Sequence, residues 1–171
     1  MEMVDIIDEH NAVLYQASKD EAHAKGLLHR CVIAEVRNAR GEWLMVRQAG
    51  HKQDAGQYVS PVGGHVQAGE EIEDALKREA EEEVGLTGFT FHHVGNAIYN
   101  REVIGRKENH LFIVYEIVSA QEPRINDESV AYRWFTEEEL IREYRDHPNH
   151  FGGAFHFVVA HFYKEKFFKA L

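Results

Sequence analysis

Residues 64–86 read GHVQAGEEIEDALKREAEEEVGL, and this stretch decides the fold. Residues 71–84 are good helix formers throughout, so the sequence predicts a helix over this range. Gly85 stands where a left-handed C-terminal cap is expected, and Leu86 can pack back against the helix. The chain therefore has a helix that ends at Gly85, with a glycine-containing segment before it.

Glutamates on this helix are spaced so that their carboxylates share one face. Glu79, Glu82 and Glu83 stand at i, i+3 and i+4, which are neighbouring positions on an α-helix. Carboxylates this close repel one another, and a shared cation would turn that repulsion into coordination. Mg²⁺ suits such a site because it prefers carboxylate and phosphate oxygens and retains waters. Taken alone, the triplet could equally be a solvated, Glu-rich face.

The residues around the triplet favour a functional interpretation, because together they match a known motif. The spacing is that of the Nudix box at every defined position, and the chain therefore resembles the Nudix hydrolase family. The defined positions are occupied by Gly64, Glu70, Arg78, Glu79, Ala80, Glu82, Glu83, Gly85 and Leu86.

The resemblance implies an α+β fold, a Nudix-type α/β/α sandwich with a mixed sheet. It implies hydrolysis of a diphosphate linkage in a nucleoside diphosphate derivative or a related organic diphosphate. The implied cofactor is Mg²⁺, for which Mn²⁺ can substitute. Glu79, Glu82 and Glu83 would bind the metal, and Gly64 would let the backbone approach it.

The implied catalytic residues are Glu79, Arg78, Glu82 and Glu108. The glutamate that matches Glu79 has been given a base role in some family members, Arg78 would orient a carboxylate, and Glu70 would support the loop and helix start. Glu108 could reach the metal centre from a later loop, as an additional ligand or as the general base. Which carboxylate is the general base stays open.

A wider resemblance extends to the branch of this superfamily that holds isopentenyl-diphosphate isomerase. It includes VDIIDEHNAVLYQASKDEAHAKGLLHR at 4–30, the segment 58–65, and INDESVAYRWFTEEEL at 125–140. The isomerase has its catalytic cysteine just before a Gly-His pair, where this chain has Gly63. Isomerase activity should therefore be lost, whereas the hydrolase box is complete.

Histidines near the predicted strands allow two interpretations. The isomerase metal site uses histidines and two glutamates; here His29, His65 and Glu108 fit it, His23 is off by a residue, and His110 replaces the second glutamate. A single histidine near a strand is more often hydrogen-bonded structure than a ligand, so we favour a structural role for His29 and His65. Whether these two and His110 form a second metal site stays open.

The remaining pattern predicts strands that surround the box helix and helices that follow them. This order is typical of an α+β sandwich, not of a parallel doubly wound sheet. Aromatic residues at helical spacing in 153–171 favour a core role over a dimer face or a lid. The polar segments 51–57 and 100–109 are candidate specificity loops. Predicted strands are 4–7, 12–15, 29–36, 42–46, 89–99, 110–118 and 130–135, and predicted helices are 18–25, 136–144 and 153–171.

Length and composition suit one soluble domain over residues 1–171, with 44% hydrophobic and 28% charged residues. A net charge of −10 argues against duplex nucleic acid or an anionic membrane surface as the main partner. The opening MEMVDIIDEH resembles neither a signal peptide nor a membrane anchor, so we expect a cytoplasmic protein. We expect a small-molecule diphosphate substrate and leave a homodimer open.

Three functions follow from these patterns, and they belong to different classes. A diphosphohydrolase is favoured by the complete box. A non-catalytic module that binds a nucleotide or diphosphate to regulate another process ranks second, because the fold could support binding alone. An isoprenoid isomerase ranks third, because Gly63 replaces the cysteine.

Overall fold

The central strand of the fold is β3 (His29–Arg37), in a computed structural model that describes residues 1–168. It pairs in parallel with β8 (Arg106–Val118) along its whole length, and antiparallel with β6 (Val62–His65). The run from Cys31 to Val36 is buried on both sides, as a nearly continuous apolar strand should be. A nine-stranded mixed sheet forms around this strand.

The other strands extend this sheet as antiparallel pairs. The strands predicted at 4–7 and 12–15 pair as an N-terminal hairpin, β7 pairs with β8, and β9 pairs with β4. These strands are β1 (Met3–Ile7), β2 (Val13–Ser18), β4 (Trp43–Gln48), β5 (Tyr58–Val59), β7 (Thr90–Val103) and β9 (Ser129–Phe135).

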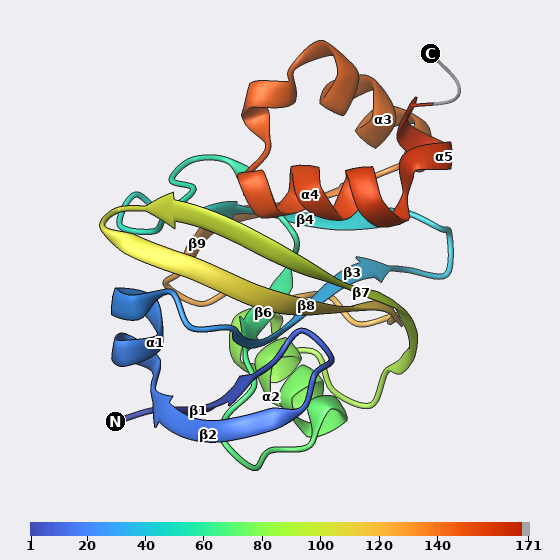
Figure 1. Ribbon diagram of the computed structural model, residues 1–171. Coiled ribbons are helices and arrows are strands. Elements are labelled where there is room, and N and C mark those ends of the chain that lie inside the picture. The colour runs from blue at the N-terminus through green and yellow to red at the C-terminus, as the bar shows by residue number, and fades with distance from the viewer. Residues whose placement is uncertain (169–171) are drawn as a thin grey trace.

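Helices lie on opposite sides of the sheet, as Figure 1 shows. Val32 and Ala34 of β3 belong to the core under α2, whereas Cys31 and Ile33 belong to the core under the C-terminal helices. The predicted α+β sandwich with a mixed sheet is therefore confirmed. The helices are α1 (Lys19–Lys25), α2 (Ile72–Val84), α3 (Glu137–Asp146), the 3₁₀ turn η1 (Pro148–His150), α4 (Gly153–Phe162) and α5 (Lys164–Phe168).

The prediction that residues 100–109 form a loop is wrong. They form the end of the long β7–β8 hairpin, which is paired as far as Val103 and Arg106. Ile104 (φ 45°) and Gly105 (φ 75°) make the two-residue turn, which is the backbone geometry that tight hairpins favour. These strand ends are polar because they project beyond the apolar core, so their pattern resembles that of a loop.

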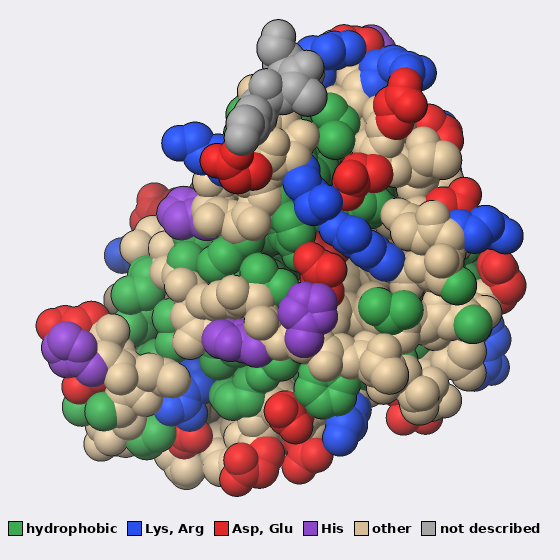
Figure 2. Space-filling model, turned by 90° about the vertical axis from the view of Figure 1, so that its right-hand side faces the viewer, with side chains coloured by type: hydrophobic (Ala, Val, Ile, Leu, Met, Phe, Trp, Pro, Cys, Tyr) green, Lys and Arg blue, Asp and Glu red, His purple; other side chains and the backbone are tan. Residues whose placement is uncertain are grey.

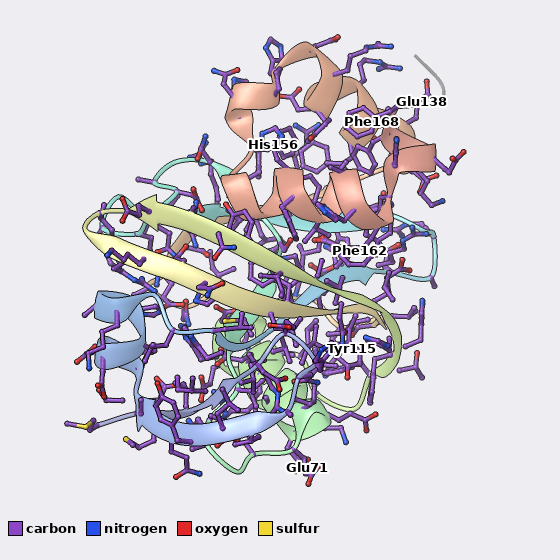
Figure 3. The ribbon with its side chains drawn as sticks, in the orientation of Figure 1. Glu71, Tyr115, Glu138, His156, Phe162 and Phe168 are labelled. Atoms are coloured by element: carbon purple, nitrogen blue, oxygen red, sulfur yellow. The ribbon has the colours of Figure 1, made fainter. Side chains whose placement is uncertain are left out.

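The single helix predicted for 153–171 is instead α4 and α5, with a break at Tyr163. Residues 169–171 of that prediction lie outside the described residues. Phe155 and Phe167 are buried against the sheet, so the core interpretation of the aromatic stripe is confirmed for them. Figure 3 shows Phe162 of α4 and Tyr115 of β8 on the two sides of the β7–β8 ribbon.

Glu35, on β3, is a fully buried carboxyl at 0% exposure. Burial disfavours its charged form and raises its pKa from 4.5 to about 7. The folded chain therefore holds this proton more tightly than the unfolded chain does. The free energy of unfolding should fall as pH rises from about 4.5 to about 7, and stay lower above that range.

We expect Glu35→Gln to remove this loss of stability. As pH rises from about 4.5 to about 7.5, the free energy of unfolding of the variant should increase by roughly 3 kcal/mol relative to that of the wild type, as measured by urea unfolding. The same change at the exposed Glu81 is the control, and it should give no such pH-dependent gain. A difference between Glu35→Gln and wild type that is constant with pH would contradict this account.

Candidate active site

Helix α2 turns its apolar stripe to the sheet and its glutamates toward a cavity. The helix spans Ile72–Val84 and ends at Gly85, whose φ of 67° is the left-handed cap that the sequence predicts. Because the stripe is buried, the carboxylates beside it are held at the border of the core. The buried helical residues are Ala75, Leu76, Glu79, Ala80 and Val84.

The cavity has a volume of about 720 Å³ and lies where α1, α2, β6 and the β7–β8 hairpin meet. Residues of the predicted loop 51–57 also line it, among them Lys52 and Asp54. All of the predicted site residues line this one cavity. They are Gly64, Arg78, Glu79, Glu82, Glu83 and Glu108.

The backbone of Gly64 lies directly against the carboxylate of Glu79. A β-carbon at Gly64 would stand 2.2 Å from Glu79 Cδ and 2.3 Å from its Oε1. No side chain can fit there while Glu79 keeps its place. Strand β6 therefore needs glycine at this position to bring the Glu79 carboxylate into the cavity wall.

Arg78 holds this carboxylate in position. It donates Nη1 to Glu79 Oε1 at 2.7 Å, and it donates Nε and Nη2 to the two oxygens of Glu70 at 2.8 and 3.0 Å. A further hydrogen bond to the carbonyl of His65 measures 3.0 Å. The bidentate pair with Glu70 fixes the plane of the guanidinium, so Glu79 has little freedom to turn.

The other two carboxylates of the face differ in their surroundings. Glu83 Oε2 accepts a hydrogen bond of 2.8 Å from the backbone N–H of Gly63. The side chain of Glu82 is 57% exposed and lies at the cavity wall. The sequence-predicted convergence of the three carboxylates is thus found, with Glu79 and Glu83 deeper than Glu82.

The face of α2 that carries Glu79, Glu82 and Glu83, here called the carboxylate face, has more negative than positive charge around it. Burial raises the pKa of Glu79 to about 7 and raises that of Glu83 well above its ordinary value, and the neighbouring glutamates act in the same direction. The donor set consists of hard oxygens around a polar cavity. The residues therefore fit a divalent cation such as Mg²⁺, which would offset both the burial and the repulsion.

Glu108 lies in the part of the cavity wall that the β7–β8 hairpin forms, where two arginines hold it. Arg101 donates Nε to its Oε1 at 2.6 Å, and Arg106 Nη2 is 3.2 Å from its Oε2. Arg101 also makes two hydrogen bonds to Asp54, at 3.1 and 3.2 Å. Both Glu108 oxygens therefore already have partners, and its role as a ligand or base stays a prediction.

The structure also brings four histidines together beside this wall. His23, which the sequence pattern placed a residue out of register, joins His29, His65 and His110 in one group. Burial is the largest cause of a lowered pKa at each of the four, which favours the neutral form of their imidazoles. The sequence comparison left open whether His29, His65 and His110 form a second metal site and placed His23 out of register; the structure shows that α1 brings His23 into the same group.

Two further charged residues, Lys52 and Glu128, line the cavity and pair at 3.0 Å. The backbone N–H of Glu128 donates to Asn126 Oδ1 at 3.0 Å, which stabilises the turn before β9. Arg101 and Arg106 were not identified from the sequence. The only sequence feature that pointed to these two arginines was an alternation of charged residues near a hairpin end. Such runs usually lie in solvent, so they do not indicate a site.

Figure 2 shows that acidic and basic side chains are interspersed among hydrophobic ones on the face that it draws. Among residues 1–168, no helix is long and apolar enough to cross a membrane.

The NUDIX domain model matches residues 27–154, which is more than half of the chain. An uncharacterized Nudix hydrolase of Streptomyces coelicolor is 42% identical over 93 residues, a stretch that is 51% of this chain and 49% of that protein. This chain spans about half the length of the first curated relatives that it matches.

Similarity also extends to an isomerase and to a solved structure. An isopentenyl-diphosphate Δ-isomerase of Photorhabdus laumondii is 31% identical over 142 residues, covering 78% of this chain and 76% of that one. A crystal structure from Deinococcus radiodurans has a TM-score of 0.71 at 23% identity, and covers 93% of this chain and 98% of that one. This last likeness concerns the fold alone.

Proposed function

Since this chain belongs to the Nudix hydrolase family, we propose that it hydrolyses a diphosphate linkage with Mg²⁺ held on the carboxylate face of α2. The substrate would be a nucleoside diphosphate derivative or a related organic diphosphate. The observation that supports this most is the convergence of Glu79, Glu82 and Glu83 on one cavity, with Gly64 against Glu79. Mn²⁺ should be able to replace Mg²⁺, because both take oxygen ligands.

Each of these residues would have a separate role, which its position in the site determines. Glu79, Glu82 and Glu83 would hold the cation, which when bound supplies charge that neutralises the diphosphate and activates water. Arg78 would keep Glu79 in its ligating orientation, and Glu70 would keep Arg78 in place. Glu79, which Arg78 holds in the cavity wall, is placed to accept a proton from water in the cavity.

The cavity wall that the β7–β8 hairpin forms could receive the phosphate groups. Arg101 and Arg106 belong to this wall, and Lys52 also lines the cavity. Their partners are Asp54, Glu108 and Glu128, so a diphosphate would compete with carboxylates already in place. Because Asp54 and Glu108 are buried, displacing them from their arginines would leave buried carboxylates without partners, so the phosphate groups would have to use N–H donors that these ion pairs leave free.

An isomerase function has one argument in favour, the sequence similarity to an isopentenyl-diphosphate isomerase. Gly63 lines the cavity where the resemblance places a cysteine, and it uses its N–H to bind Glu83. Cys31, the only cysteine, is buried, and burial raises its pKa. These features favour hydrolysis over an allylic proton shift.

The test is Mg²⁺-dependent release of phosphate or diphosphate from a panel of nucleoside diphosphate derivatives, dinucleotides and isoprenoid diphosphates. We expect at least one compound to be cleaved with Mg²⁺ or Mn²⁺ and none with a chelator. Tight Mg²⁺-dependent binding without cleavage of any compound would instead indicate the regulatory module. Conversion of isopentenyl diphosphate to its allylic isomer would indicate the isomerase.

Arg78→Lys should lower turnover by roughly 10- to 100-fold, because lysine cannot pair bidentately with Glu70 and orient Glu79 together. The rate of cleavage of the best panel compound at saturating Mg²⁺ measures this. Arg142→Lys is the matched control, since Arg142 makes an exposed ion pair on α3. Full activity in Arg78→Lys would contradict the positioning role.

A further inference from the structure

The four buried histidines come from four different elements and point their ring nitrogens at one spot. His23 is on α1, His29 on β3, His65 on β6 and His110 on β8, and one ligand atom from each lies within 4.8 Å of all the others. Packing alone gives no reason for four polar rings to converge. Such a group needs a partner that accepts several nitrogen lone pairs at once.

The spacing of the nitrogens matches a tetrahedral metal site. His23 Nε2 is 3.3 Å from His110 Nε2 and 3.2 Å from His65 Nε2. Nitrogens that surround Zn²⁺ at their usual bond length lie about 3.3–3.4 Å apart. An ion of this size therefore fits between them with small side-chain movements.

His29 gives a second, independent sign. Its Nδ1 is 2.7 Å from the carbonyl oxygen of Leu27, which can only accept, so Nδ1 holds the proton and Nε2 holds a lone pair. Nε2 is buried and has no hydrogen-bond partner among the described residues. This arrangement, with the outer nitrogen fixed by a carbonyl and the inner one unpaired, is how metal-ligating histidines are oriented.

Hydrogen bonds among the rings cannot satisfy the group. Arg106 Nη2 is 3.1 Å from His23 Nε2 and can only donate, so His23 Nε2 must be its acceptor. His65 and His110 would then have to donate to the same single lone pair. Two of these three contacts must go without a proper hydrogen bond, and a metal ion would replace all of them.

We propose that His23, His29, His65 and His110 form a second metal site that takes a nitrogen-preferring divalent metal of the zinc class. The ligands are all imidazoles, because both oxygens of Glu108 are held by Arg101 and Arg106. An all-nitrogen set favours Zn²⁺, Co²⁺ or Ni²⁺ over Mg²⁺. Four protein ligands complete a tetrahedral site, which is the structural type.

The consequence for the fold is local. The metal would join α1 to β3, β6 and β8, and α1 contributes Lys19 and Asp20 to the wall of the large cavity. Metal binding would therefore fix one wall of that cavity. When the metal is bound, Arg106 would leave His23 and keep its ion pair with Glu108.

The test uses the whole chain, stripped of metal and titrated with Co²⁺ and Zn²⁺. We expect one Co²⁺ per chain with the strong visible absorption of tetrahedral coordination, displaced by Zn²⁺ but not by millimolar Mg²⁺. Zn²⁺ should raise Tm by about 5–10 °C when its free concentration is roughly 100 times Kd. Absence of stoichiometric Co²⁺ absorption would overturn the proposal.

Loss of a group that only hydrogen-bonds to a metal ligand weakens metal binding by roughly 10- to 100-fold. His23→Asn removes a ligand itself, so it should weaken Zn²⁺ binding by more than that. His10→Asn is the matched control, since His10 is exposed in the N-terminal hairpin. Wild-type affinity in His23→Asn would refute the site. If that variant does not fold, X-ray absorption of the wild-type Zn²⁺ complex decides, because a carboxylate among the ligands would refute an all-histidine site.

Glu82→Gln separates this site from the proposed hydrolase. That variant should keep the Co²⁺ absorption, because Glu82 is not among the four ligands. Loss of the absorption in Glu82→Gln would mean that Co²⁺ reports on the carboxylate face, and would overturn the second site. A protein that binds Zn²⁺ as described but cleaves no diphosphate would leave this inference standing.

Discussion

Glu82→Gln is expected to lower Mg²⁺-dependent turnover by roughly 100- to 1000-fold, because loss of a metal ligand's charge removes several kcal/mol of transition-state stabilisation. The substitution keeps nearly the same shape. Glu82 is also largely exposed, so folding should be intact by circular dichroism and thermal unfolding. Turnover should therefore fall without a change in Tm.

The matched control for this variant is Glu81→Gln. It makes the same chemical change one residue earlier on α2, at an exposed position outside the cavity lining. Its rate should equal that of the wild type. Equal loss in both variants would show that the helix needs its negative charge in general, and unchanged turnover in Glu82→Gln would remove Glu82 from the site.

Gly64→Ala is expected to lower turnover by roughly 100-fold, which is the loss that a displacement of about 1 Å can cause in a reacting group. The new methyl group would overlap the Glu79 carboxylate, which lies 2.2 Å from its position. The atoms that it meets are the carboxylate at the end of the Glu79 side chain, so the methyl group should push this carboxylate out of its hydrogen bond with Arg78 while β6 stays paired with β3. The fold should persist while the ligand geometry is lost.

Gly50→Ala is the control for this change. Gly50 is exposed in a turn, and a β-carbon there would meet nothing within 4 Å. Steady-state rates and Mg²⁺ titrations of both variants should show that only Gly64→Ala needs more Mg²⁺. Wild-type Mg²⁺ dependence in Gly64→Ala would contradict the close contact between Gly64 and Glu79.

The parts of the site that depend on local spacing were predicted from the sequence. Glu79, Glu82 and Glu83 share a face because of helix periodicity, and Gly85 ends that helix because it tolerates a positive φ. The α+β sandwich was predicted for the same reason, since strand and helix periods differ. These features need no knowledge of distant contacts.

The features of the site that depend on contacts between distant residues could not be predicted from spacing or periodicity. His23 meets His110 although 87 residues separate them, and only the packing of α1 on β8 brings them together. The end of the β7–β8 hairpin was predicted as a loop because its residues are polar. The ion pair between Arg101 and Glu108 explains why polar residues are stable there.

The most direct test of the central claim is cleavage of the diphosphate panel in H₂¹⁸O with Mg²⁺, followed by mass spectrometry of the products. We predict that at least one compound is cleaved between its two phosphorus atoms, and that a single ¹⁸O enters one phosphate product. Wild-type protein that leaves the whole panel intact, or that only rearranges an isoprenoid diphosphate without taking up ¹⁸O, would contradict the account.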